Sequence, residues 1–143
     1  MLLIGPENGD HIRIEIAGRE RPEDSDFWDG NWLVSSVKVQ AGAWSGSFRA
    51  LLRAEEFEQF LSQTEQLYKD LEGTAEFIPM EPWIIVKLTG NKLGQIAVEG
   101  EACDKVGIGN TLKFHLQIDQ TYLPAIITSL KKIIREYPVI GRE

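Results

Sequence analysis

The side chains of this chain best suited to metal binding or nucleophilic catalysis are two histidines and one cysteine. His11 and His115 each lack a cysteine or second histidine at the short spacing that zinc sites use. His115 stands beside Lys113 and Gln117 on the polar side of a predicted strand, which favours an ordinary surface histidine. Cys103 has no base beside it, so a small buried hydrophobic residue is favoured over a reactive thiol. We therefore expect no metal, no cofactor and no enzymatic activity.

Three stretches come near to known functional motifs and do not complete them. Trp44–Ser47 lacks the glycine-flanked serine of a nucleophile elbow, and a strand rather than a helix follows it. Gly107–Asn110 lacks the third glycine of a dinucleotide-binding loop and also leads into a strand. Asp24–Gly30 is nearest to a calcium loop. Its fifth position is Trp28, its sixth is Asp29, and no helices are predicted on either side, so calcium binding is not expected.

The same acidic stretch has the composition of a protein-binding surface. Phe27 and Trp28 stand among carboxylates, the combination of aromatic anchor and charge found at interface hot spots. The alternative is that aromatic residues here fill the end of a sheet, which is the interpretation favoured for Trp32. The candidate partner-binding residues are Glu23, Asp24, Asp26, Phe27, Trp28, Asp29, Glu55 and Glu58.

The net charge of −7 is unevenly distributed along the chain. Residues 1–30 carry eight acids and three bases, residues 53–76 carry seven acids and two bases, and the remaining segments sum to +3. Such acidity argues against nucleic-acid binding, which needs clustered Lys and Arg. It favours a basic protein partner, mainly through the association rate, with plain solubility as the alternative reading.

A strand that runs into the last helix is the clearest of the elements that must position these residues. Apolar and polar residues alternate from Leu112 to Ile118, the period of a half-buried strand. From Leu123 to Tyr137 apolar residues recur every three or four positions, which predicts a helix with one apolar stripe. We expect Thr121 to cap this helix.

An earlier helix follows the same pattern, with a stripe from Phe57 to Leu71 and an expected left-handed cap at Gly73. When the sequence is shifted by 66 residues, the apolar positions of this region align with those of the closing strand and helix. The two halves therefore share a strand-hairpin-helix pattern. Two further strand features are predicted. Alternation slips at Ser35–Ser36, which indicates a bulge, and the run Ile84–Val86 indicates a central strand.

The fold class predicted is α+β, with about eight short, mostly antiparallel strands and two amphipathic helices packed on one face of the sheet. At 143 residues we expect a single domain, residues 1–143. No apolar run approaches the roughly 20 residues that span a bilayer, so no membrane association is expected. One cysteine excludes an internal disulfide and fits a reducing compartment, so we expect a cytoplasmic protein.

Several short elements carry a resemblance to a known family. They are Asp29–Leu33, Gly46–Phe48, Gly73–Phe77, Glu81–Trp83, Asn110–Phe114 and Tyr137–Pro138. With the closing helix they resemble the WapI-type immunity protein family over nearly the whole chain. Their turn glycines and core aromatics name no catalytic residue. The resemblance implies a bacterial, cytoplasmic binding protein without cofactor, which protects a cell against the toxic C-terminal domain of a contact-dependent toxin of the WapA kind.

Two functions of different class follow. The first is a non-catalytic immunity-type protein that neutralises a basic toxin domain by surface binding. The second is a small-molecule or regulatory binding domain with a pocket between sheet and helices.

Overall fold

A computed structural model describes residues 1–143, and it confirms the predicted α+β class with eight strands. The strands divide into two sheets, each with its strands in sequence order and every neighbouring pair antiparallel. The first sheet contains β1 (Leu2–Ile4), β2 (His11–Arg19), β3 (Trp32–Ala41) and β4 (Trp44–Arg53). The second contains β5 (Glu72–Phe77), β6 (Ile84–Asn91), β7 (Gln95–Cys103) and β8 (Thr111–Asp119).

Each sheet leads into one long helix, so the chain repeats the same order of elements. α2 (Ala54–Asp70) follows β4, and α3 (Leu123–Glu136) follows β8 through the 3-10 turn η1 (Gln120–Tyr122). The shared pattern seen in the sequence therefore extends to four strands and a helix in each half. A third helix, α1 (Phe27–Gly30), has only four residues and interrupts the connection between β2 and β3.

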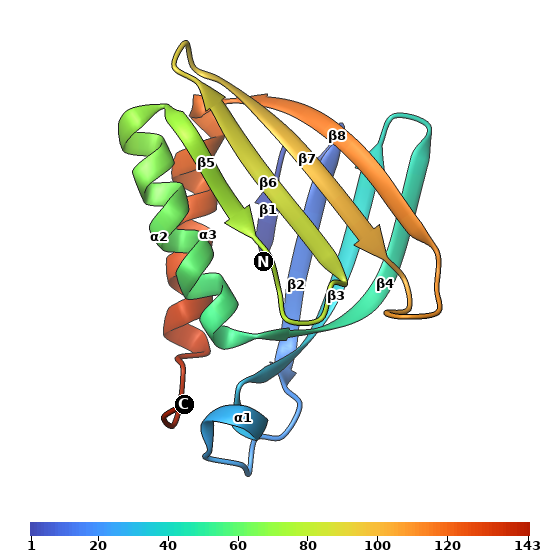
Figure 1. The fold of residues 1–143 in the computed structure, drawn as a ribbon, viewed down its shortest axis with the longest axis vertical. Coiled ribbons are helices and arrows are strands. Elements are labelled where there is room, and N and C mark those ends of the chain that lie inside the picture. The colour runs from blue at the N-terminus through green and yellow to red at the C-terminus, as the bar shows by residue number, and fades with distance from the viewer.

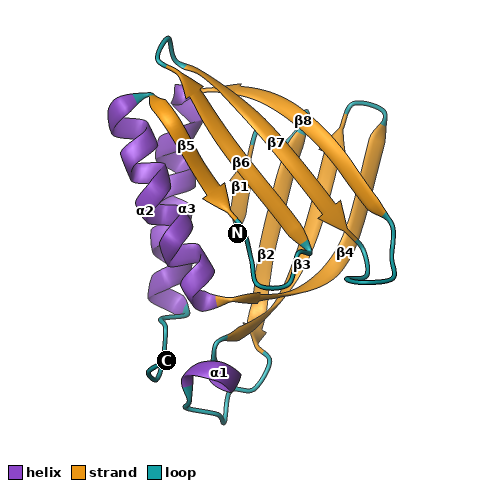
Figure 2. Ribbon diagram, viewed as in Figure 1, coloured by secondary structure: helices purple, strands orange, loops and turns teal.

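The two sheets face each other, and α2 and α3 lie side by side along the edge where β1 and β5 are found (Figures 1 and 2). α2 packs on β5 and on α3, and α3 also contacts β1. Three aromatic side chains fill the space between α2 and the second sheet. Phe57 and Phe60 on α2 lie with their ring centroids 5.2 Å and 5.6 Å from that of Phe77 on β5. The apolar stripes of both helices are thus buried against the sheets.

Two helix-cap predictions were wrong, because in each case a residue two positions earlier in the chain provides the cap. Asp119 rather than Thr121 caps the start of the last helical segment, since its carboxylate accepts a hydrogen bond from the Thr121 backbone N–H (2.8 Å). At the end of α2 the left-handed position falls on Leu71, with φ of 57°, two residues before the expected Gly73. The Leu71 N–H still closes the helix by donating to the Leu67 carbonyl oxygen (2.7 Å).

The expected bulge lies on the partner strand. The register shifts between Ile16 and Gly18 of β2, opposite Ser35, while β3 itself alternates regularly. Ser35 points into the core and donates its hydroxyl to the Leu33 carbonyl oxygen (3.2 Å), so a polar residue in a core position caused the apparent slip. β6 is central in its sheet as expected, although Ile85 on its outer face is only half-buried.

None of the helices has the length and continuous hydropathy needed to cross a lipid bilayer.

Candidate functional site

The acidic connection after β2 is held in a defined shape by one helical turn. Asp26 caps α1, accepting a hydrogen bond from the Asp29 N–H (3.0 Å) on its side-chain oxygen and from the Gly30 N–H (3.0 Å) on its carbonyl. An aspartate at this position satisfies backbone donors that a short helix cannot pair internally. The sequence predicted an irregular connection here, because four residues are too few to show helical periodicity.

Arg53, the last residue of β4, lies against this turn and forms hydrogen bonds with it. Its side chain is 1% exposed, and its guanidinium donates to two α1 carbonyl oxygens, Nη2 to Phe27 (2.7 Å) and Nη1 to Trp28 (2.8 Å). Its Nε donates to the carboxylate of Glu55 in the first turn of α2. One buried cation therefore connects α1 to the beginning of α2.

Three aromatic rings surround the same guanidinium. The Arg53 Cζ atom lies 5.1 Å from the ring centroid of Phe27, 5.5 Å from that of Trp28 and 4.8 Å from that of Trp32. Aromatic faces stabilise a guanidinium that has lost its water, and Arg is more weakly hydrated than Lys. The rings of Phe27 and Trp28 also meet edge to face, with centroids 5.0 Å apart. The position of the Trp28 ring is thus fixed although 51% of the residue is exposed.

Hydrogen bonds through Asn31 and Arg19 also link the C-terminal segment to α1. Asn31 is fully buried, donates to the carbonyl oxygens of Phe27 and Ile140 (both 2.9 Å), and accepts from the Ile140 N–H (3.0 Å). Arg19 donates to the carbonyl oxygens of Gly30 (2.8 Å) and Pro138. A Cβ atom at Gly30 would lie 2.5 Å from the end of the Ile140 side chain and 2.8 Å from the Asp24 carbonyl oxygen, so a larger residue would force the backbone to shift.

Glu56 joins the start of α2 to the connection between β5 and β6. It is 7% exposed, and its two carboxylate oxygens accept hydrogen bonds from the backbone N–H of Arg53 (2.7 Å) and of Met80 (2.6 Å). Burial raises the pKa of Glu56 to about 7, outweighing these two hydrogen bonds, which lower it.

The structure gathers most of the predicted partner-binding residues at one end of the molecule. Phe27, Trp28 and Glu55 meet at Arg53, and the carboxylates of Asp24, Asp26 and Asp29 converge within 4.8 Å of one another. Glu23 is exposed in the turn before α1, and Glu58 is exposed on α2 one turn beyond Glu55. We call this set the α1 surface: Glu23, Asp24, Asp26, Phe27, Trp28, Asp29, Glu55 and Glu58.

Arg53 and Asn31, which hold the α1 surface in place, were not predicted from the sequence. Arg53 and Asn31 make contacts across 25 and 109 residues of sequence, so the hydrophobic periodicity of the chain does not reveal them. One signal was present for Arg53. A basic residue directly before a helix opposes the helix dipole, and its occurrence there indicates a specific partner.

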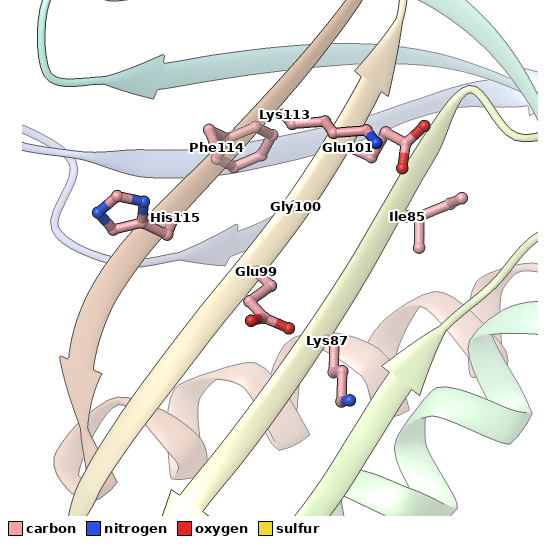
Figure 3. A pocket seen from close by; sticks show the side chains of 8 residues that line it. All are labelled: Ile85, Lys87, Glu99, Gly100, Glu101, Lys113, Phe114 and His115. Carbon is pink, nitrogen blue, oxygen red and sulfur yellow. The ribbon is translucent and has the colours of Figure 1, made fainter.

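A second candidate region is a shallow groove on the outer face of the second sheet, with a volume of about 480 Å³ (Figure 3). Acidic and basic side chains alternate across it, with Lys113 extending toward Glu101. The Phe114 ring covers Gly100, where a Cβ atom would meet ring carbon Cζ at 2.1 Å. We call this region the outer groove, and its lining is Ile85, Lys87, Glu99, Gly100, Glu101, Lys113, Phe114 and His115.

The two histidines and the cysteine lie apart from the α1 surface. His115 is exposed and pairs with Glu99 across β7 and β8, as the polar face of its strand predicted. His11 is buried, with its Nδ1 atom 2.8 Å from the Gly9 carbonyl oxygen. Cys103 is half-buried, with its sulfur 3.2 Å from the Lys105 carbonyl oxygen.

Comparison with known proteins identifies one family. A sequence profile of the immunity protein WapI-like family matches residues 2–138. Among curated proteins none matches the sequence. A structure of MRP1/MRP2 from Trypanosoma bruciei is similar with a TM-score of 0.47 and 12% identity, over 87% of this chain and 83% of that one. A CdiA-CT/CdiI toxin and immunity complex from Enterobacter cloacae gives a TM-score of 0.44 and 11% identity, over 85% of this chain and 99% of that one. Structural likenesses this slight carry no argument about this chain.

Proposed function

The chain belongs to the WapI-like family of immunity proteins, and we propose that it neutralises a cognate toxin domain by binding to the toxin's surface. In this proposal the protein is not an enzyme, holds no cofactor and acts in the cytoplasm of the bacterium that makes it. The contact is made by the α1 surface, and the partner is a basic protein domain.

The observation that carries the proposal is the exposed but immobilised Trp28. Half of this residue faces solvent, yet its carbonyl and its ring are both held by the buried Arg53. A rigid aromatic side chain loses little conformational entropy on binding, which is why such residues dominate interface energetics. The carboxylates around it outnumber the exposed Arg21, which lies 3.9 Å from Asp24, and this negative excess would steer a basic partner toward the anchor.

The proposed surface also suggests how toxicity is blocked. If the toxin domain cleaves nucleic acid, its substrate groove must be basic to bind phosphates. Asp24, Asp26 and Asp29 place three carboxylates within 4.8 Å of one another, a concentration of negative charge that such a groove would accept in place of phosphates. In that case this chain would inhibit the toxin simply by occupying the toxin's substrate groove.

The test first searches the genome for a large secreted protein encoded beside the gene for this chain, and then uses that protein's C-terminal domain, purified with its active site inactivated. We expect it to bind the wild-type chain, and Trp28→Ala to raise the dissociation rate at least about tenfold, as for a hot-spot residue. Lys87→Ala, in the outer groove, is the control and should change it less than about twofold. Equal effects of the two variants, or none from Trp28→Ala, would refute a binding role for the α1 surface.

The alternative function, a small-molecule binding domain, has less support. The space between helices and sheets, where a pocket was expected, is filled by Phe57, Phe60 and Phe77. An apolar groove of about 280 Å³ does lie between β4 and β8, with Trp44 and Phe48 on one wall. This volume falls just below the ~300–1,000 Å³ typical of ligand sites.

A further inference from the structure

The connection between β5 and β6 exposes two large apolar side chains on a stiff backbone. Ile78 and Met80 are each 59% exposed. Pro79 and Pro82 restrict the chain on either side of Met80, and the Met80 N–H is fixed by its hydrogen bond to Glu56 (2.6 Å). Other strongly exposed apolar residues, Trp44, Leu93 and Ile108, lie in or directly beside turns between strands.

A chain of buried contacts joins this connection to the α1 surface. Met80 donates to Glu56, Glu56 accepts from the Arg53 N–H (2.7 Å), and the Arg53 guanidinium donates to the Trp28 carbonyl oxygen (2.8 Å). Two side chains and three hydrogen bonds therefore separate Met80 from Trp28. So short a link allows one interface of standard size, about 800 Å² on each partner, to cover both residues.

Acidic side chains predominate around the two apolar sites, where Arg21, 55% exposed and 3.9 Å from Asp24, is outnumbered by carboxylates. Arg53 is buried and engaged by Glu55, so it presents no positive charge to a partner. Glu58 is exposed on α2, and Glu81 follows Met80 directly. An acidic rim of this kind repels anionic lipid and nucleic acid and attracts a basic protein.

We propose that Ile78 and Met80 form a second apolar contact of the partner-binding surface, and that one basic toxin domain covers them together with Trp28. This inference rests on the proposed function and extends its site to the β5–β6 connection. Both contacts are supported by the first turn of α2, so they are presented in a fixed relative position. A partner that buries both gains apolar area without having to order either loop.

The experiment compares the double variant Ile78→Ala/Met80→Ala with Leu93→Ala/Ile108→Ala, which removes two equally apolar side chains from turns. Alanine keeps the Met80 N–H, so the bond to Glu56 and the fold are retained, as circular dichroism and a thermal melt would check. The binding probe is the inactivated toxin C-terminal domain described above. We expect the Ile78/Met80 variant to dissociate at least about tenfold faster, with an association rate within about twofold of wild type. The Leu93/Ile108 variant should dissociate as wild type does.

The possible results distinguish a failure of the second apolar contact from a failure of the proposed function. If Trp28→Ala speeds dissociation and Ile78→Ala/Met80→Ala does not, the second contact is refuted while the proposed function stands. If neither changes the rate, both are refuted. A comparable loss in the Leu93/Ile108 variant would place the partner elsewhere and also refute both.

Discussion

The α1 surface and the outer groove are both rich in charged residues, but they differ in what supports them. At the α1 surface, Trp28 is exposed while its backbone and ring are fixed by a buried arginine. In the outer groove the charged side chains alternate in sign across three neighbouring strands, with acids on β7 and bases on β6 and β8, and no ion pair within 4.0 Å joins them. Charge alone therefore does not distinguish a binding surface from a solvated sheet face. The distinguishing feature is an apolar side chain held in position before any partner arrives.

The largest expected effect comes from removing the cation beneath the α1 surface. Arg53→Met leaves two carbonyl oxygens and the Glu55 carboxylate without their donor, and should reduce the free energy of unfolding by about 3–5 kcal/mol. Urea denaturation would measure the loss. In the outer groove, Lys87→Met should change stability by less than about 0.5 kcal/mol. Similar values for the two variants would contradict the difference drawn between the regions.

Glu56 should make the stability of the chain depend on pH. Its pKa is about 7 in the folded chain against an ordinary value of 4.5, so the folded state holds the proton more tightly. The stabilisation is present in full below pH 4.5 and is lost as pH rises through 7, a change of about 2–4 kcal/mol. Glu56→Gln should remove this slope from urea denaturation series, whereas Glu99→Gln should keep it. A wild-type slope that survives in Glu56→Gln would mean that another group titrates.

Gly100 tests the packing on the core side of the second sheet, directly beneath the outer groove. A Cβ atom there meets the Phe114 ring, so Gly100→Ala should cost about 1–3 kcal/mol of stability, as overpacking does. Adding Phe114→Leu should recover part of that loss in a thermal melt. Binding of the toxin domain should stay unchanged in both variants, and weakened binding would assign the groove a role in recognition.

The smallest expected effect is kinetic and concerns the three clustered carboxylates. Replacing Asp24, Asp26 and Asp29 together by Asn preserves the cap at Asp26, because asparagine caps helices as well as aspartate does. The variant should associate with the toxin domain about tenfold more slowly at low salt and show a flatter salt dependence, with little change in dissociation. An unchanged salt dependence would mean that these acids serve solubility alone.

The sequence predicted local features well and long-range ones poorly, for physical reasons. The stripe from Leu123 to Tyr137 and the alternation from Leu112 to Ile118 report helix and strand periods directly, and both elements formed. The division into two sheets was not predicted, because local periodicity does not encode which strands pair. The aromatic and acidic residues beside α1 could be proposed from composition. Their support by Arg53, Asn31 and Ile140 could not, since those contacts exist only after the chain folds.

The most direct test of the central claim is amide hydrogen–deuterium exchange of the chain, alone and in complex with the inactivated toxin domain. We expect slowed exchange in peptides covering residues 20–31 and 78–83, with exchange at residues 97–101 and 113–117 of the outer groove unchanged. Protection confined to the outer groove, with none at residues 20–31, would contradict that claim.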